Sequence, residues 1–174
     1  MITPRKVYRR FVEFEERAAA IYLQLASRFS HDPKLSSFWL LMALHEKQHA
    51  GLLQFCLQDG LFASDLPDSA EIQKTAALFK RLETRAAAPM LNVEDAFELA
   101  LELESSEVNS LYCYLTTTLH SSMYLLRRKI ASSMPDHVDE LLVTARKFGV
   151  KNHATEELRK KLKKDCSSHF AARK

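Results

Sequence analysis

Two carboxylates and an imidazole occur at spacings that suit a metal ion. Residues 45–49 read His-Glu-Lys-Gln-His, between the apolar runs 38–42 and 52–53. Glu46 and His49 are three residues apart, so on a helix they project from one face and can bind the same ion. An earlier glutamate, Glu15, lies on another predicted helix. Charges buried in a helix bundle without compensation cost several kcal/mol, and a bound cation offsets that cost. The pattern therefore predicts a metal site.

The first two predicted helices bring these residues to the same level. Side chains on one face recur at alternating spacings of four and three over residues 4–29, namely Phe11, Glu15, Ala18, Tyr22, Leu25 and Phe29. Asp32 as N-cap and Pro33 at the first helical position predict a second helix that ends near Asp59-Gly60. Glu15 and His49 are about equally far from the turn between the helices, so we expect them to lie at the same height.

The composition predicts an all-α fold. Only 3 glycines and 5 prolines occur in 174 residues, with 47% hydrophobic and 27% charged residues, and a β-rich fold needs more turn residues. The chain is short enough for a single domain over residues 1–174. A long connection over residues 61–91 contains a short amphipathic helix at about residues 69–85.

The second half supplies two more main helices. Asn92 with Asp95 resembles a capping box that lacks its preferred Glu and opens the third helix. We expect this helix to stop near residues 120–122, with a short extra element at residues 123–134. The fourth helix follows the break at Pro135 and runs to about Lys164. Four main helices with one long crossover between the second and third predict a single-crossover bundle.

The second half also repeats the chemistry of the first. Glu15-x-x-Ala18-x-x-x-Tyr22 reappears as Glu107-x-x-Ser110-x-x-x-Tyr114, and His49-Ala50 reappears as His153-Ala154. A pair of metal ions that share bridging carboxylates requires such a twofold arrangement of one glutamate helix and one histidine helix.

On these residues the chain resembles the ferritin-like superfamily, and most closely its rubrerythrin-type di-iron bundles, over residues 5–60 and 92–165. The firmest match is Phe14-Glu15-Glu16-Arg17-Ala18 through Tyr22, followed by Leu44-His45-Glu46-Lys47-Gln48-His49-Ala50. Glu104-Ser105-Ser106-Glu107 is similar to the E-x-x-E of the family, and either glutamate can be the fixed ligand and the other the mobile one. The resemblance implies six metal ligands: Glu15, Glu46, His49, Glu104, Glu107 and His153.

The chain departs from the family at one ligand position. The second E-x-x-H of the family would place a bridging Glu three residues before His153, where this chain has Val150. Two close cations then lose one ligand and one compensating charge. We therefore expect one firm site made by Glu15, Glu46 and His49, unless Glu104 and Glu107 together make up the loss.

The resemblance implies a non-haem metal protein with one or two iron ions, manganese and zinc being possible substitutes. It implies peroxide reduction, with electrons from a separate donor because the chain has no C-x-x-C pair for an electron-transfer iron centre. The alternative is a non-catalytic metal-binding, storage or sensor protein. A remote alternative is a zinc protease of the H-E-x-x-H type, but the extended motif fails after His49 and few strand signals exist.

Composition and charge indicate few other partners. The net charge is +3, and its excess of Lys and Arg at residues 159–164 is typical of a solvated helix end, so no nucleic-acid binding is expected. No apolar run reaches membrane-spanning length and the start has no apolar signal region. With three isolated cysteines, these features predict a cytoplasmic protein. Analogy with ferritin-like bundles predicts a homodimer.

Overall fold

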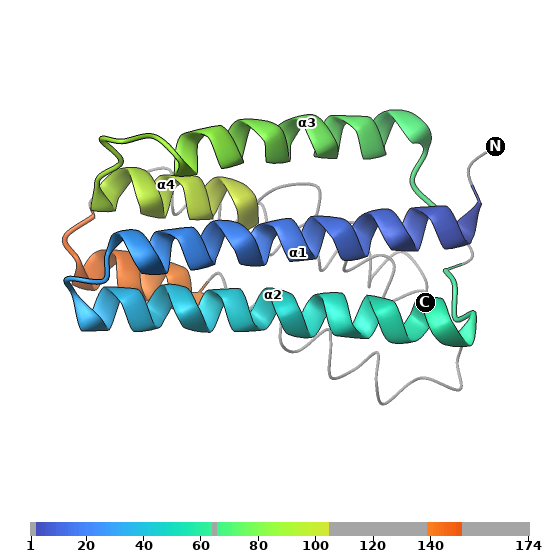
Figure 1. Cartoon of the computed structure of the whole chain (residues 1–174), viewed down its shortest axis with the longest axis horizontal. Coiled ribbons are helices and arrows are strands. Elements are labelled where there is room, and N and C mark those ends of the chain that lie inside the picture. The colour runs from blue at the N-terminus through green and yellow to red at the C-terminus, as the bar shows by residue number, and fades with distance from the viewer. Residues whose placement is uncertain (1–2, 64–65, 105–138, 151–174) are drawn as a thin grey trace, which may run out of the picture. The chain divides into compact units, whose positions relative to one another are not determined.

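In the computed structural model, the described residues are 3–63, 66–104 and 139–150, and every regular element among them is a helix (Figure 1). The helices are α1 (Pro4–Arg28), α2 (Pro33–Asp59), α3 (Ser69–Ala86) and α4 (Val93–Glu104), and residues 139–147 are also helical. The all-α class is therefore confirmed. No helix in these ranges has the length and apolar character needed to cross a bilayer.

The chain divides into two compact units, Met1–Leu91 and Asn92–Lys174. The first unit contains α1, α2 and α3, and the second contains α4 and the helical residues 139–147. The single domain over residues 1–174 stays a prediction.

Local capping explains where α1 and α2 begin and end. The Thr3 hydroxyl accepts from the backbone N–H of Lys6, at 3.4 Å, and Pro4 follows in the first turn. Asp32 caps α2 by accepting from two backbone N–H groups at 3.0 and 3.2 Å, with Pro33 next. Gly60 ends α2 in the left-handed conformation, with φ of 68°. These ends confirm the predicted helices over residues 4–29 and 33–59.

The core of the first unit lies where α1 packs against α2 and α3 (Figure 1). Tyr22 of α1 stacks on Trp39 of α2, with ring centroids 5.9 Å apart and planes at 10°. Phe14 of α1 stacks on Phe79 of α3 at 5.2 Å and 4°. All four rings are fully buried. Burying large aromatic side chains at these helix contacts supplies much of the apolar free energy that holds the three helices together.

The short helix predicted in the long connection is α3. Asp68 and Glu71 form a complete capping box at its start, because each side chain accepts from the backbone N–H of the other residue. The apolar face of α3 is buried through Ile72, Phe79, Leu82 and Ala86. The prediction of an amphipathic helix at residues 69–85 is confirmed.

In the second unit, the start of α4 also follows the sequence. The Asn92 side chain accepts from the Asp95 N–H at 2.9 Å, and the Asp95 carboxylate accepts from the Asn92 N–H at 3.1 Å. The capping box predicted without a Glu is thus formed with Asp in its place.

The predicted fourth helix, by contrast, is wrong at residues 148–150. Gly149 has φ of 77°, its N–H donates to Arg146 O at 3.1 Å, and the Val150 N–H donates to Ala145 O at 3.0 Å. This pair of bonds is the Schellman motif, which ends a helix. Val150 therefore lies just beyond the end of the helix over residues 139–147. The end of the third main helix, the element at 123–134 and the chain after residue 150 lie outside the described residues.

Candidate metal centre

Three side chains that can bind a metal ion converge inside the first unit. Glu15 comes from α1, and Glu46 and His49 come from α2. One ligand atom of each lies within 4.8 Å of the other two. The three residues are only 1%, 3% and 5% exposed, in that order. Ligands from two helices are thus gathered at one buried point, as the sequence predicted for these three residues.

The imidazole and the carboxylates face one another through particular atoms. His49 Nδ1 lies 3.2 Å from Glu46 Oε2 and 3.8 Å from Glu15 Oε2. Two ligand atoms about 2.1 Å from one cation are roughly 3.0 Å apart at a right angle and 3.4 Å apart at a tetrahedral angle. The spacing between His49 and Glu46 fits that range, and the 3.8 Å between His49 and Glu15 exceeds it by a few tenths of an ångström.

The charges of the group, with both carboxylates ionised, are compatible with a cation between these atoms. Two ionised carboxylates bring two negative charges, and a neutral imidazole that presents a lone pair to them would be repelled. A neutral imidazole with its proton on Nδ1 can donate to an oxygen but adds no charge, and an imidazolium would balance only one of the two negative charges. A divalent metal ion balances both and accepts the lone pairs of all three residues.

The orientation of Glu15 follows from the pattern of α1. Phe11, four residues before Glu15, and Ala18, three residues after it, lie on the same helix face and are buried. Glu16 is exposed and forms an ion pair with Lys47 of α2. Glu15 therefore faces inward and Glu16 outward, as the alternating spacing predicted. The Glu16 and Lys47 side chains are 47% and 48% exposed, so losing this ion pair costs little stability.

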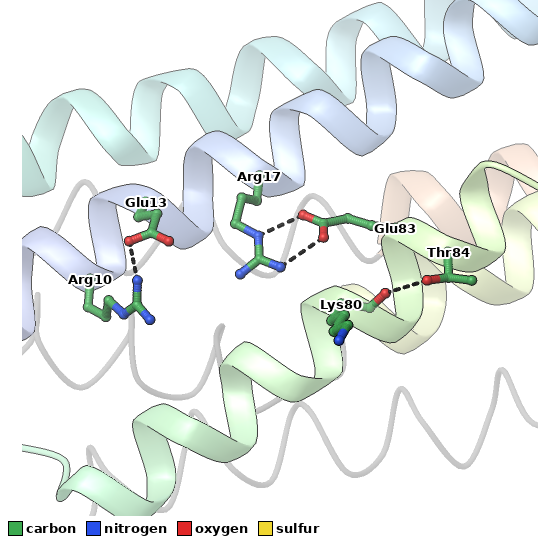
Figure 2. Close-up of polar contacts among 6 residues, drawn as sticks. All are labelled: Arg10, Glu13, Arg17, Lys80, Glu83 and Thr84. Carbon is green, nitrogen blue, oxygen red and sulfur yellow. Dashed lines mark hydrogen bonds and ion pairs between the residues drawn. The ribbon is translucent and has the colours of Figure 1, made fainter.

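A second polar contact holds α1 to α3 two residues after Glu15. Arg17 donates from Nε and Nη2 to the two carboxylate oxygens of Glu83, at 2.6 and 2.8 Å (Figure 2). Its guanidinium also lies 5.0 Å from the centroid of the Phe79 ring. The Arg17 guanidinium holds the pKa of Glu83 below its usual value, and the hydrogen bonds that Arg17 donates to Glu83 raise the pKa of Arg17. Sequence reasoning did not find this contact.

Of the other three predicted ligands, only Glu104 lies among the described residues. Glu104 is buried, at 3% exposure, and is the last residue of α4 in the second unit. Glu107 and His153 lie outside the described residues. His45, the other histidine of the H-E-x-x-H pattern, is half-buried and does not belong to the three-residue group found among the described residues.

Two further buried polar groups belong to the packing of the first unit. The Tyr8 hydroxyl accepts from the Ala63 N–H at 3.0 Å, and burial raises the pKa of Tyr8 to about 12. Burial likewise raises the pKa of the Cys56 thiol to about 11. A thiol with that pKa stays protonated at neutral pH, and Cys56 is not part of the Glu15–Glu46–His49 group.

Comparison with models of known families, with curated proteins and with solved structures finds no match to this chain. The class of protein is thus defined by its own features: an all-α protein whose first unit buries a Glu-Glu-His group between two helices.

Proposed function

We propose that this protein binds one divalent transition-metal ion, iron or manganese, through Glu15, Glu46 and His49. The observation that carries the proposal is the convergence of these three ligand atoms within 4.8 Å, with every residue at most 5% exposed. Keeping two carboxylates and an imidazole together in such a place is costly without a cation. A cation of two positive charges removes that cost.

The ligand set favours iron or manganese over softer ions. Carboxylate oxygens are hard ligands that suit manganese and ferrous or ferric iron, and one imidazole is compatible with both metals. Three protein ligands leave open positions on a metal that prefers five or six. An ion bound in this way can take water, peroxide or dioxygen and supply redox chemistry, while the buried helices keep bulk water away.

The same geometry speaks against a zinc protease. In the H-E-x-x-H pattern of such enzymes, His45 and His49 would bind zinc and Glu46 would stay off the metal as the base. Here the Glu46 carboxylate lies 3.2 Å from His49 Nδ1, and the half-buried His45 is not part of the group. The carboxylate site is the arrangement that these distances support.

The finer proposal is a ferritin-like bundle of the rubrerythrin type that reduces peroxide. Its support is the Glu15 and Glu46-x-x-His49 half-site together with the long connection that contains α3. Under this proposal, Glu104, Glu107 and His153 serve a second, weaker position, and electrons come from a separate protein. Glu104 is buried, as a ligand of this kind would be.

The test is a titration of metal-free protein with Mn²⁺, and with Fe²⁺ under anaerobic conditions, followed by calorimetry. We expect one firmly bound ion per chain, and fewer than two in all. Glu15→Gln and His49→Ala abolish this binding, while the adjacent exposed Glu16→Gln is the matched control and binds normally. Wild-type protein that takes up neither ion, or Glu15→Gln that binds as Glu16→Gln does, contradicts the proposal.

A second assay separates the enzyme from a non-catalytic binder. Ferrous protein is mixed with a slight excess of peroxide, and oxidation of iron is followed by absorbance. Rapid oxidation in which one peroxide is reduced to two waters for every two ferrous ions oxidised supports peroxide reduction, whereas slow oxidation at the rate of free Fe²⁺ leaves metal binding as the function.

A further inference from the structure

The residues on either side of Glu15 are both held by α3. Phe14 stacks on Phe79 at 5.2 Å with the planes at 4°. Arg17 makes two hydrogen bonds to Glu83, at 2.6 and 2.8 Å, and lies over the same Phe79 ring (Figure 2). We call these four residues, Phe14, Arg17, Phe79 and Glu83, the α1–α3 clamp.

The clamp fixes the rotation of α1 about its own axis. Phe14 and Arg17 are three residues apart and share one face, and Glu15 projects roughly 100° around the helix from Phe14. α3 therefore holds one side of α1 while Glu15 reaches toward the ligands of α2 from another. The carboxylate lies roughly 6 Å from the helix axis, so a rotation of about 10° moves it by about 1 Å. Metal sites tolerate ligand distances that depart by only about 0.2 Å.

The other polar contacts drawn in Figure 2 do not have this effect. Arg10 and Glu13 form an ion pair within α1, with side chains 45% and 48% exposed. Thr84 donates to the Lys80 carbonyl within α3, at 2.8 Å. Of the contacts drawn in Figure 2, the one between Arg17 and Glu83 alone joins two helices. The Arg10–Glu13 pair is therefore a matched control.

We propose that the α1–α3 clamp couples the docking of α3 to metal binding at Glu15, so that each strengthens the other. This inference rests on the proposed metal site and adds a regulatory element to it. A docked α3 holds Glu15 in the rotation that the ion requires, and a bound ion restricts α1 to the rotation that α3 recognises. Coupling of this kind is reciprocal: the factor by which docking tightens metal binding is the factor by which metal tightens docking.

The reciprocity gives two independent measurements on the full chain. In the first, Mn²⁺ affinity is compared by calorimetry among wild type, Glu83→Gln, Arg17→Lys and the control Glu13→Gln. By comparison with residues that orient metal ligands, we expect Glu83→Gln to weaken binding by about 5- to 10-fold. Arg17→Lys keeps the positive charge but loses the bidentate contact with Glu83, so we expect its Mn²⁺ affinity to lie between those of wild type and Glu83→Gln. Glu13→Gln stays within twofold of wild type.

The second measurement is made first on wild-type protein. Hydrogen exchange of backbone amides in α3 is followed in wild-type protein with and without Mn²⁺. We expect Mn²⁺ to slow exchange across α3, although α3 contributes no ligand to the Glu15–Glu46–His49 group. Glu83→Gln should show a smaller slowing. If Glu83 had only a structural role, Glu83→Gln would change the stability of the metal-free and the Mn²⁺-bound protein equally. The slowing of α3 amide exchange by Mn²⁺ would then be as large as in wild type.

The outcomes separate the two proposals. If wild type binds Mn²⁺ but α3 exchanges at the same rate with and without it, the coupling is refuted and the metal site stands. Equal Mn²⁺ affinity in Glu83→Gln and Glu13→Gln, with helix content unchanged by circular dichroism, refutes it as well. If wild type binds no metal at all, both proposals fail.

Discussion

Replacing Glu15 by Gln should stabilise the metal-free protein while removing its response to metal. The Glu15 and Glu46 ligand atoms are at most 4.8 Å apart, and at an effective dielectric constant of about 20 two unit charges at that distance repel by about 3.5 kcal/mol. His49 offsets part of this repulsion. Loss of one buried charge should therefore raise the free energy of unfolding of the metal-free protein by about 1–2 kcal/mol.

With bound metal, wild type should become more stable than Glu15→Gln, the reverse of the order without metal. An ion present at a hundred times its Kd adds about 2.7 kcal/mol to a protein that binds it only when folded. For a chain of this size each kcal/mol shifts Tm by about 2–4 °C, so Mn²⁺ should raise the Tm of wild type by roughly 5–10 °C. Glu15→Gln should show no such shift.

The assay is thermal unfolding followed by circular dichroism, with chelator or with excess Mn²⁺. Glu16→Gln is the matched control, because its side chain is exposed and lies one residue away; its Tm should respond to Mn²⁺ as wild type does. A metal-free Glu15→Gln that melts well below metal-free wild type, or that is still stabilised by Mn²⁺, would refute the reasoning.

Three further predictions concern single groups of the first unit. Arg17 lowers the pKa of Glu83 from its usual 4.5, so the extra stability of wild type over Glu83→Gln should be complete above pH 4.5 and disappear as the pH falls through the lowered pKa. Denaturant unfolding of both proteins across this pH range checks the prediction. A stability difference between them that persists in acid contradicts it. Burial raises the pKa of the Cys56 thiol to about 11, so iodoacetamide at pH 8 should label Cys56 only after unfolding, as read by peptide mass spectrometry. Gly51 is exposed inside α2 with nothing within 4 Å of a new Cβ, so Gly51→Ala should stabilise by about 0.5–1 kcal/mol. Gly60 has φ of 68°, so Gly60→Ala should destabilise by about 1 kcal/mol, and equal effects at the two glycines would refute this pair.

The ends of α1, α2 and α3 could be predicted because local groups determine them. Asp32, Pro33 and Gly60 act on the backbone within a few residues, and the spacing of apolar side chains needs no knowledge of the partner helix. The inward orientation of Glu15 followed from the same spacing. These predictions depend on contacts close in sequence, which is why they were confirmed.

The helix end at Gly149 shows where this reasoning stops. Gly51 lies inside α2, while Gly149 ends a helix with φ of 77°. Glycine is compatible with both the right-handed helical and the left-handed backbone conformation, so a glycine in the sequence does not by itself say whether a helix continues or ends there. The Arg17–Glu83 contact was missed for another reason: it joins two helices distant in sequence, and no local pattern gives the direction from which α3 approaches α1.

The most direct test of the central claim is anomalous diffraction from crystals grown with Mn²⁺. The account predicts one strong anomalous peak in the first unit, about 2.0–2.3 Å from a carboxylate oxygen of Glu15, a carboxylate oxygen of Glu46 and Nδ1 of His49. Crystals that show Mn²⁺ elsewhere, with these three side chains joined only by hydrogen bonds to one another, would contradict it.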